Sequence, residues 1–298
     1  MFTLHTTQGG VHPPQCKEAR DFACVSIAPP QRVKIPLNMH IGGPCRPVVA
    51  AGDHVYVGTL IGDGQGLYAP IHASISGTVV STDEEKLPTG QTAPVVRIES
   101  DGKMEADPAL AAPTYGTREE FIDCVRASGM VGLGGASFPT WFKMRAPEGK
   151  RFEVLVVNGM ECEPYITSDF RQMMEHAERV VAGVARVVEA LGIPEAVIGV
   201  EDNKPEAVEK LAAEIEAQGL TGKFMIIRRK RNATFEIKMQ PYSRICKPID
   251  FFISPIKQIV ALQFLFYINL SYSQNKNRQN QYNEPKEYLS LPHQTLNT

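Results

Sequence analysis

The chain has 298 residues, a formal net charge of −2 and a pI near 6.4, a balance that gives no reason to expect nucleic acid as a partner. Its six cysteines contain no C-x-x-C pair, which argues against structural zinc, cysteine-ligated iron–sulfur clusters and a secreted disulfide framework. The first ten residues are polar and lack the apolar core of a signal peptide, so we expect a reducing, cytoplasmic location. The length has room for two domains that each bury a core.

Residues 1–112 are expected to form a β-rich domain. Two extended runs flank a Gly-Asp turn within residues 47–58, and a second unit of this kind covers residues 68–80. The arrangement resembles the flattened β-barrel, or barrel-sandwich hybrid, of biotinyl and lipoyl carrier domains. Those carriers hold their cofactor on a lysine at a hairpin tip, and no lysine lies between Ala69 and Gly77. We therefore expect the scaffold without the carrier function.

Residues 113–228 have the pattern of an α/β domain. Thr117 and Glu120 form a capping box that predicts the start of a helix. Strands and helices then alternate, as the apolar periodicity and the flanking Gly and Pro residues indicate: strand 153–157, helix 173–191, strand 196–201, a helix from Pro205, and strand 223–227. This βαβαβ order predicts a parallel, Rossmann-like sheet, in which ligands bind at the carboxyl ends of the strands.

Residues 229–298 differ in composition from the rest of the chain. The last glycine is Gly222, and Asn, Gln, Ile, Phe and Tyr dominate beyond it. Residues 259–270 are strongly apolar, but a membrane span needs about 20 apolar residues. We interpret this part as an irregular, poorly ordered, foreign or out-of-frame tail, with a membrane-associating segment as the alternative.

The segment 132–140, GLGGASFPT, is the first candidate for a binding site. Closely spaced glycines let a backbone turn tightly and approach a ligand, and free N–H groups beside a helix N-terminus suit a phosphate. Within and just after the segment, Phe138 offers a ring face and Lys143 a positive charge. The segment is thus typical of a nucleotide or flavin cradle.

The segment 158–165, NGMECEPY, is the second candidate and follows the predicted strand 153–157. It contributes the Asn158 amide and the carboxylates of Glu161 and Glu163. These two acids either line a ligand site or are solvated loop residues. The turn 201–204 follows the neighbouring strand, so both segments are expected at the carboxyl edge of one sheet.

Five segments together resemble the RnfC family, a subunit of the Rnf electron transport complex. They are residues 9–14, 36–44, 132–140, 158–167 and 198–205. The middle domain is also similar to the flavin-bearing NADH-dehydrogenase subunit of respiratory complex I. The resemblance runs from about residue 8 to 227 and implies an FMN-binding, NADH-oxidising module on the cytoplasmic face of the plasma membrane, in a complex that couples electron flow between NADH and ferredoxin to ion translocation. Its expected partners are the other membrane subunits and, through the complex, ferredoxin.

The resemblance also implies roles for individual residues. The flavin phosphate would be wrapped by Gly132, Gly134, Gly135 and Ala136. Phe138 would lie near the nicotinamide, Lys143 would help to hold the flavin, and the rest of the site would be lined by Asn158, Glu161, Glu163, Glu201 and Asp202. Leu133 stands where the complex I protein usually has arginine, so no charge role is transferred to that position.

The resemblance implies a further part that this sequence lacks. Full-length family members continue with another sheet domain and with C-x-x-C-x-x-C-x-x-x-C-P runs that ligate 4Fe–4S clusters, whereas here the likeness stops near Ile227. Two alternatives therefore stand beside the Rnf interpretation: a truncated, non-functional fragment, and a flavin-dependent reductase of the cobalamin-recycling type. Residues 9–14 favour the Rnf family over the latter.

Overall fold

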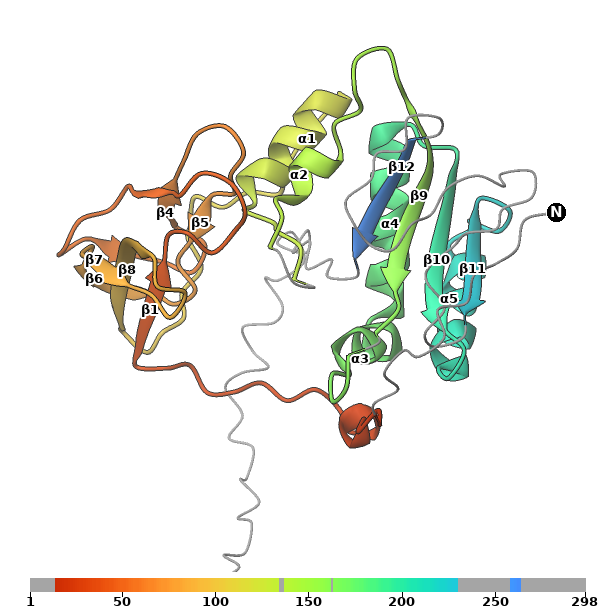
Figure 1. Ribbon diagram of the computed structural model, residues 1–298, viewed down its shortest axis with the longest axis horizontal. Helices are drawn as coiled ribbons and strands as arrows, with labels where there is room; N and C mark the ends of the chain where they lie inside the picture. Colours follow the sequence, from red (N-terminus) through yellow and green to blue (C-terminus); the bar gives the residue numbers. More distant parts are fainter. Residues whose placement is uncertain (1–13, 134–136, 162, 230–257, 264–298) are drawn as a thin grey trace, which may run out of the picture.

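The computed structural model describes residues 14–133, 137–161, 163–229 and 258–263. A β-rich unit and an α/β unit lie side by side (Figure 1). A short 3-10 helix, Glu18–Asp21, precedes both and lies against the α/β unit.

The β-rich unit consists of two antiparallel sheets. β1 (Arg32–Pro36), β8 (Thr92–Ser100), β6 (Gly77–Ser81) and β3 (His54–Val55) lie in that order in the first sheet, with β7 (Glu84–Lys86) paired to β8. The second sheet has the order β2 (Arg46–Pro47), β4 (Leu60–Asp63) and β5 (Ile71–His72). Apolar side chains of both sheets form one core. The described strands therefore enclose a core between two sheets and do not close into the single flattened barrel that the sequence predicts.

The α/β unit has the predicted alternation around a four-stranded parallel sheet. The order in space is β11 (Phe224–Arg229), β10 (Glu195–Glu201), β9 (Phe152–Gly159) and β12 (Gln258–Gln263). Helices α1 (Arg118–Ala127), α2 (Thr140–Lys143), α3 (Ser168–Glu175), α4 (Ala177–Leu191) and α5 (Pro205–Ala217) complete the unit. The larger core joins side chains of these helices to side chains of β9 and β10, and the capping box at Thr117 and Glu120 is present as predicted.

Two features of this unit differ from the sequence prediction. The expected helix 173–191 is two helices, because His176 has φ −139° and ψ 37°, outside the helical range. Apolar spacing does not reveal this break, since Met173 and Ala177 on either side of it are both buried in the same core. The tail also contains a strand, β12, which pairs in parallel with β9; an apolar run of this length fits a sheet strand as well as an irregular segment.

Trp141 of α2 joins the two units. Its indole Nε1 donates a buried hydrogen bond of 2.7 Å to the backbone oxygen of Tyr68, and the Arg126 guanidinium lies over both of these rings. Arg126 also donates to the Tyr68 hydroxyl at 2.9 Å. The hairpin formed by residues 130–140 is thereby anchored to the β-rich unit.

Trp141→Phe should lower the free energy of unfolding by about 1–3 kcal/mol, because it leaves a buried carbonyl without its donor. Phe142→Leu, at the neighbouring half-exposed position, is the control and should change it by well under that amount. Urea unfolding followed by circular dichroism measures both variants, since Trp141 is the chain's single tryptophan. Equal effects of the two substitutions would contradict the anchoring role.

Candidate functional site

The glycine-rich segment forms a closed loop at the start of α2. Gly132 N donates to Phe138 O at 2.9 Å, Thr140 N donates to Met130 O at 3.0 Å, and Val131 forms an antiparallel bridge with Pro139. Backbone pairing on both sides of the loop fixes its two ends against each other. The loop is also tied to the β-rich unit, because Ile41 N donates to the oxygen of Ser137 at 3.3 Å.

Three predicted residues meet at this loop. A Cβ atom added at Gly132 would lie 3.6 Å from Lys143 Nζ, and that Nζ is 5.7 Å from the centroid of the Phe138 ring. Burial lowers the pKa of Lys143 from its ordinary value, as desolvation does for any ammonium group. Gly134, Gly135 and Ala136 lie outside the described residues, so their proposed contact with a phosphate stays a prediction.

The second predicted segment leads into a buried cluster of charges at the carboxyl edge of the sheet. Glu161 is 1% exposed, and Glu201, the last residue of β10, is equally buried. Lys204 places its Nζ 3.2 Å from Glu161 Oε2 and 3.1 Å from Glu201 Oε2. Glu161 is therefore not a solvated loop acid, because its carboxylate is paired in the interior.

The N-terminus of α3 contributes to the same cluster. Asp169 N donates to Glu161 Oε1 at 2.7 Å, and the Ser168 hydroxyl lies 3.4 Å from the same oxygen. Burial of the Asp169 side chain, reinforced by the negative charge of Glu161, raises its pKa from 3.8 to about 7. The cluster thus contains an acid that holds its proton near neutral pH.

The other predicted residues of this edge lie differently. Asn158 lies near the end of β9, with its side-chain oxygen accepting from Met160 N at 3.0 Å, which shapes the turn after the strand. Glu163 and Asp202 are exposed. The structure therefore places Asn158, Glu161 and Glu201 at one edge of the sheet, as expected, but only the two glutamates enter the buried cluster.

Three members of the cluster were not predicted from the sequence. Lys204 follows Glu201 by three residues across the turn into α5, a spacing that offers a local signal. Asp169 lies in the first turn of α3, and its contact with Glu161 spans eight residues. Lys17 places Nζ 3.5 Å from Glu161 Oε2 across 144 residues of sequence, and no local pattern indicates such a contact.

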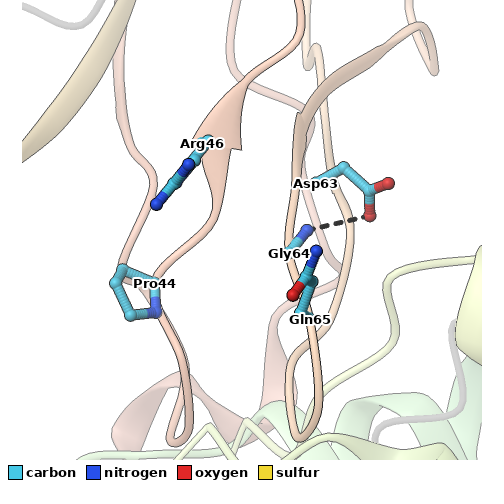
Figure 2. Close-up of a pocket in the computed structure, with 5 residues that line it drawn as sticks. All are labelled: Pro44, Arg46, Asp63, Gly64 and Gln65. Atoms are coloured by element: carbon cyan, nitrogen blue, oxygen red, sulfur yellow. Dashed lines mark hydrogen bonds between the residues drawn. The ribbon is translucent and has the colours of Figure 1, made fainter.

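A cavity of about 440 Å³ lies in the β-rich unit, away from both predicted segments. Figure 2 shows its lining on the two sides of the β2–β4 pair, with Arg46 facing across from Asp63, whose carboxylate accepts from Gly64 N at 2.9 Å. None of the predicted site residues lines it. We find no helix among the described residues with the length and apolar character to cross a membrane.

Two protein families match this chain in separate regions. Residues 5–103 match the RnfC barrel sandwich hybrid domain, and residues 125–243 match the Nuo51 FMN-binding domain. The second match contains both the glycine-rich loop and the acidic edge of the sheet. The all-β plus α/β organisation that the sequence predicts is thus confirmed, while the boundaries at 112 and 228 stay predictions.

Curated C subunits of ion-translocating oxidoreductase complexes have similar sequences over most of this chain. That of the Na⁺-translocating ferredoxin:NAD⁺ oxidoreductase complex of Acetobacterium woodii is 41% identical over 70% of this chain and 48% of its own length. That of the proton-translocating ferredoxin:NAD⁺ oxidoreductase complex of Clostridium ljungdahlii is 39% identical over 72% of this chain and 48% of its own length. That of the ion-translocating oxidoreductase complex of Rhodobacter capsulatus is 35% identical over 74% and 44% respectively.

The chain spans about half the length of these curated relatives. A crystal structure of a NAD⁺-reducing nickel–iron hydrogenase in the H₂-reduced state aligns with 49% of this chain and 28% of that chain, at 19% identity and a TM-score of 0.41, which is too low to support a conclusion. The sequence relatives and the two domain matches agree with each other. They confirm the resemblance that the motifs predict: this chain belongs to the RnfC family, the C subunits of the Rnf ion-translocating oxidoreductase complexes.

Proposed function

We propose that this chain is an electron-transfer subunit of a membrane-associated, ion-translocating NADH:ferredoxin oxidoreductase and that its α/β unit binds FMN and NADH. The match of residues 125–243 to an FMN-binding domain carries the proposal. The proposed place of work is the cytoplasmic face of the membrane, as a peripheral subunit beside the other subunits of the complex, with ferredoxin reached through the complex. The 4Fe–4S clusters of the family would belong to regions outside this sequence, whose cysteines have no C-x-x-C spacing.

The residues of the glycine-rich loop suit a phosphate-bearing flavin. Lys143 supplies a partly desolvated ammonium beside the bare backbone of Gly132, and an anion is bound more strongly where water is displaced from the charges. Phe138 adds an aromatic face next to that ammonium. Gly134, Gly135 and Ala136 would complete the contact to the phosphate with their backbone N–H groups.

The protein's part in the proposed chemistry is to position two rings and to exclude water from them. Bound FMN would supply the acceptor for the hydride of NADH. The nucleotide site at the carboxyl edge of the sheet would be lined by Asn158, Glu161, Glu163, Glu201 and Asp202. No side chain is required as a proton donor or acceptor in that step, so binding and orientation are the expected contributions of this chain.

The test uses the full chain reconstituted with FMN under anaerobic conditions. We expect FMN to be retained through gel filtration and its visible absorption band to bleach when NADH is added. Lys143→Met should weaken FMN binding by about tenfold or more, since it removes a buried charge from the phosphate site, whereas the exposed Lys150→Met should not. Failure of the wild-type chain to retain FMN would refute the proposal.

A further inference from the structure

The N-terminal segment of residues 15–24 packs against the carboxyl edge of the parallel sheet, far from the strands that follow it in sequence. It contacts the turns after both central strands: Gln15 O accepts from Tyr165 N at 2.9 Å, and Gln15 Oε1 accepts from the Asn203 side chain at 3.2 Å. Further along, Arg171 donates to Arg20 O at 3.0 Å. The segment therefore bridges the turns that follow β9 and β10.

Lys17 is the most deeply placed contact of this segment. Its side chain is 8% exposed, and its ammonium group donates to Glu161 O at 2.5 Å and to Ile166 O at 2.8 Å. Its third neighbour is the Glu161 carboxylate, 3.5 Å away at Oε2. An ammonium group has three N–H donors, so one lysine ties together the two ends of the turn 161–166.

This turn needs such an anchor. Tyr165 lies within it at φ +67°, a left-handed conformation that costs a non-glycine residue about 1–2 kcal/mol. The Tyr165 side chain is 72% exposed and its backbone is held by Gln15. A strained turn persists where its surroundings fix it, and here the fixing groups come from residues 15–17.

We propose that residues 15–24 are a working part of the candidate site and that Lys17 is the positioning residue that holds the turn 161–166 for the nucleotide ligand. This inference rests on the proposed function, because Glu161 and Glu163 of this turn are the acids expected to line the nucleotide site. Lys17 acts through the turn and not on the ligand. Its ammonium fixes the backbone of the turn at both ends and, with Lys204, balances the buried Glu161.

Lys17→Met in the full chain tests the proposal, with Lys17→Arg as the conservative variant and the exposed Lys150→Met as the control. We expect amide hydrogen exchange in residues 160–166 to become faster in Lys17→Met without ligand. We also expect the dissociation constant of NAD⁺, measured by calorimetry on the FMN-loaded protein, to rise on the order of tenfold, as for a displaced binding group. Lys17→Arg should recover part of both effects, because it keeps the charge and several donors.

The outcomes separate the two proposals. If the wild-type chain does not bind FMN, the proposed function fails, and the exchange experiment then decides on the anchor alone. If the wild type binds FMN and NAD⁺ while Lys17→Met matches it in affinity, the positioning role is refuted, whether or not exchange in the turn changes. Should Lys17→Met fail to fold, Lys17→Gln keeps two N–H donors without the charge and takes its place, with the same two readouts.

Discussion

Lys204→Met should lower the free energy of unfolding by about 3–5 kcal/mol, the range observed when one partner of a buried ion pair is removed. Lys204 Nζ lies between the carboxylates of Glu161 and Glu201, and all three side chains are at most 3% exposed. Neither water nor salt can replace the lost cation at such a depth. Urea unfolding at neutral pH measures the effect.

The same helix supplies the matched control for this substitution. Lys210 is also in α5, is exposed, and donates to Met174 O, so Lys210→Met should cost about 1 kcal/mol or less. Adding Glu201→Gln to Lys204→Met should recover part of the lost stability, because it removes one of the two unbalanced charges. Similar losses in the two lysine variants, with no recovery in the double variant, would mean that Lys204 does not balance the buried acids.

Asp169→Asn should make the protein more stable than the wild type at pH 8, by on the order of 1–3 kcal/mol. Burial is the main cause that raises the pKa of Asp169 to about 7, and Glu161 and Glu163 raise it further while Lys204 and Lys17 oppose them. The folded state therefore keeps a proton that the unfolded chain releases between about pH 4 and pH 7. Unfolding is favoured as pH rises through this window, and a rise in pKa of this size corresponds to at most roughly 4 kcal/mol.

The sign of this effect determines the measurement. Below pH 4 the carboxyl is protonated in both states, so the two proteins should differ least there, and above pH 7 the advantage of the variant should be fully present. Unfolding free energies from urea titrations at pH 5 and pH 8 give the two slopes. Asp123→Asn, an exposed position on α1, should leave the wild-type slope unchanged. A variant that loses stability with pH as steeply as the wild type would refute the assignment of this proton to Asp169.

Local sequence signals predicted much of the α/β unit. The capping box at Thr117 began α1, and the apolar runs became β9, β10 and β11 in the expected parallel order. These elements follow from patterns within a few residues of each other, where backbone capping and side-chain periodicity act. The glycine-rich loop also brought Gly132, Phe138 and Lys143 together, because they are separated by only eleven residues of chain that turns back on itself.

Where the sequence prediction was incomplete, the missing information was non-local. The apolar run in β12 gives no sign that its partner is β9, about a hundred residues earlier, and the period of residues 173–191 does not reveal the break at His176. Two sheets around one core replaced the expected closed barrel, since alternating short strands fit both arrangements.

The sequence by itself determined the family, the division into a β-rich and an α/β part, and the candidate loops at 132–140 and 158–165. Only the tertiary structure decided that Glu161 is buried, that Lys204 and Asp169 surround it, and that Lys17 arrives from the other end of the chain to hold its turn. The physical reason is that motifs are fixed by neighbours along the chain, whereas the ionic environment of a buried carboxylate depends on which distant segments fold against it and displace its water.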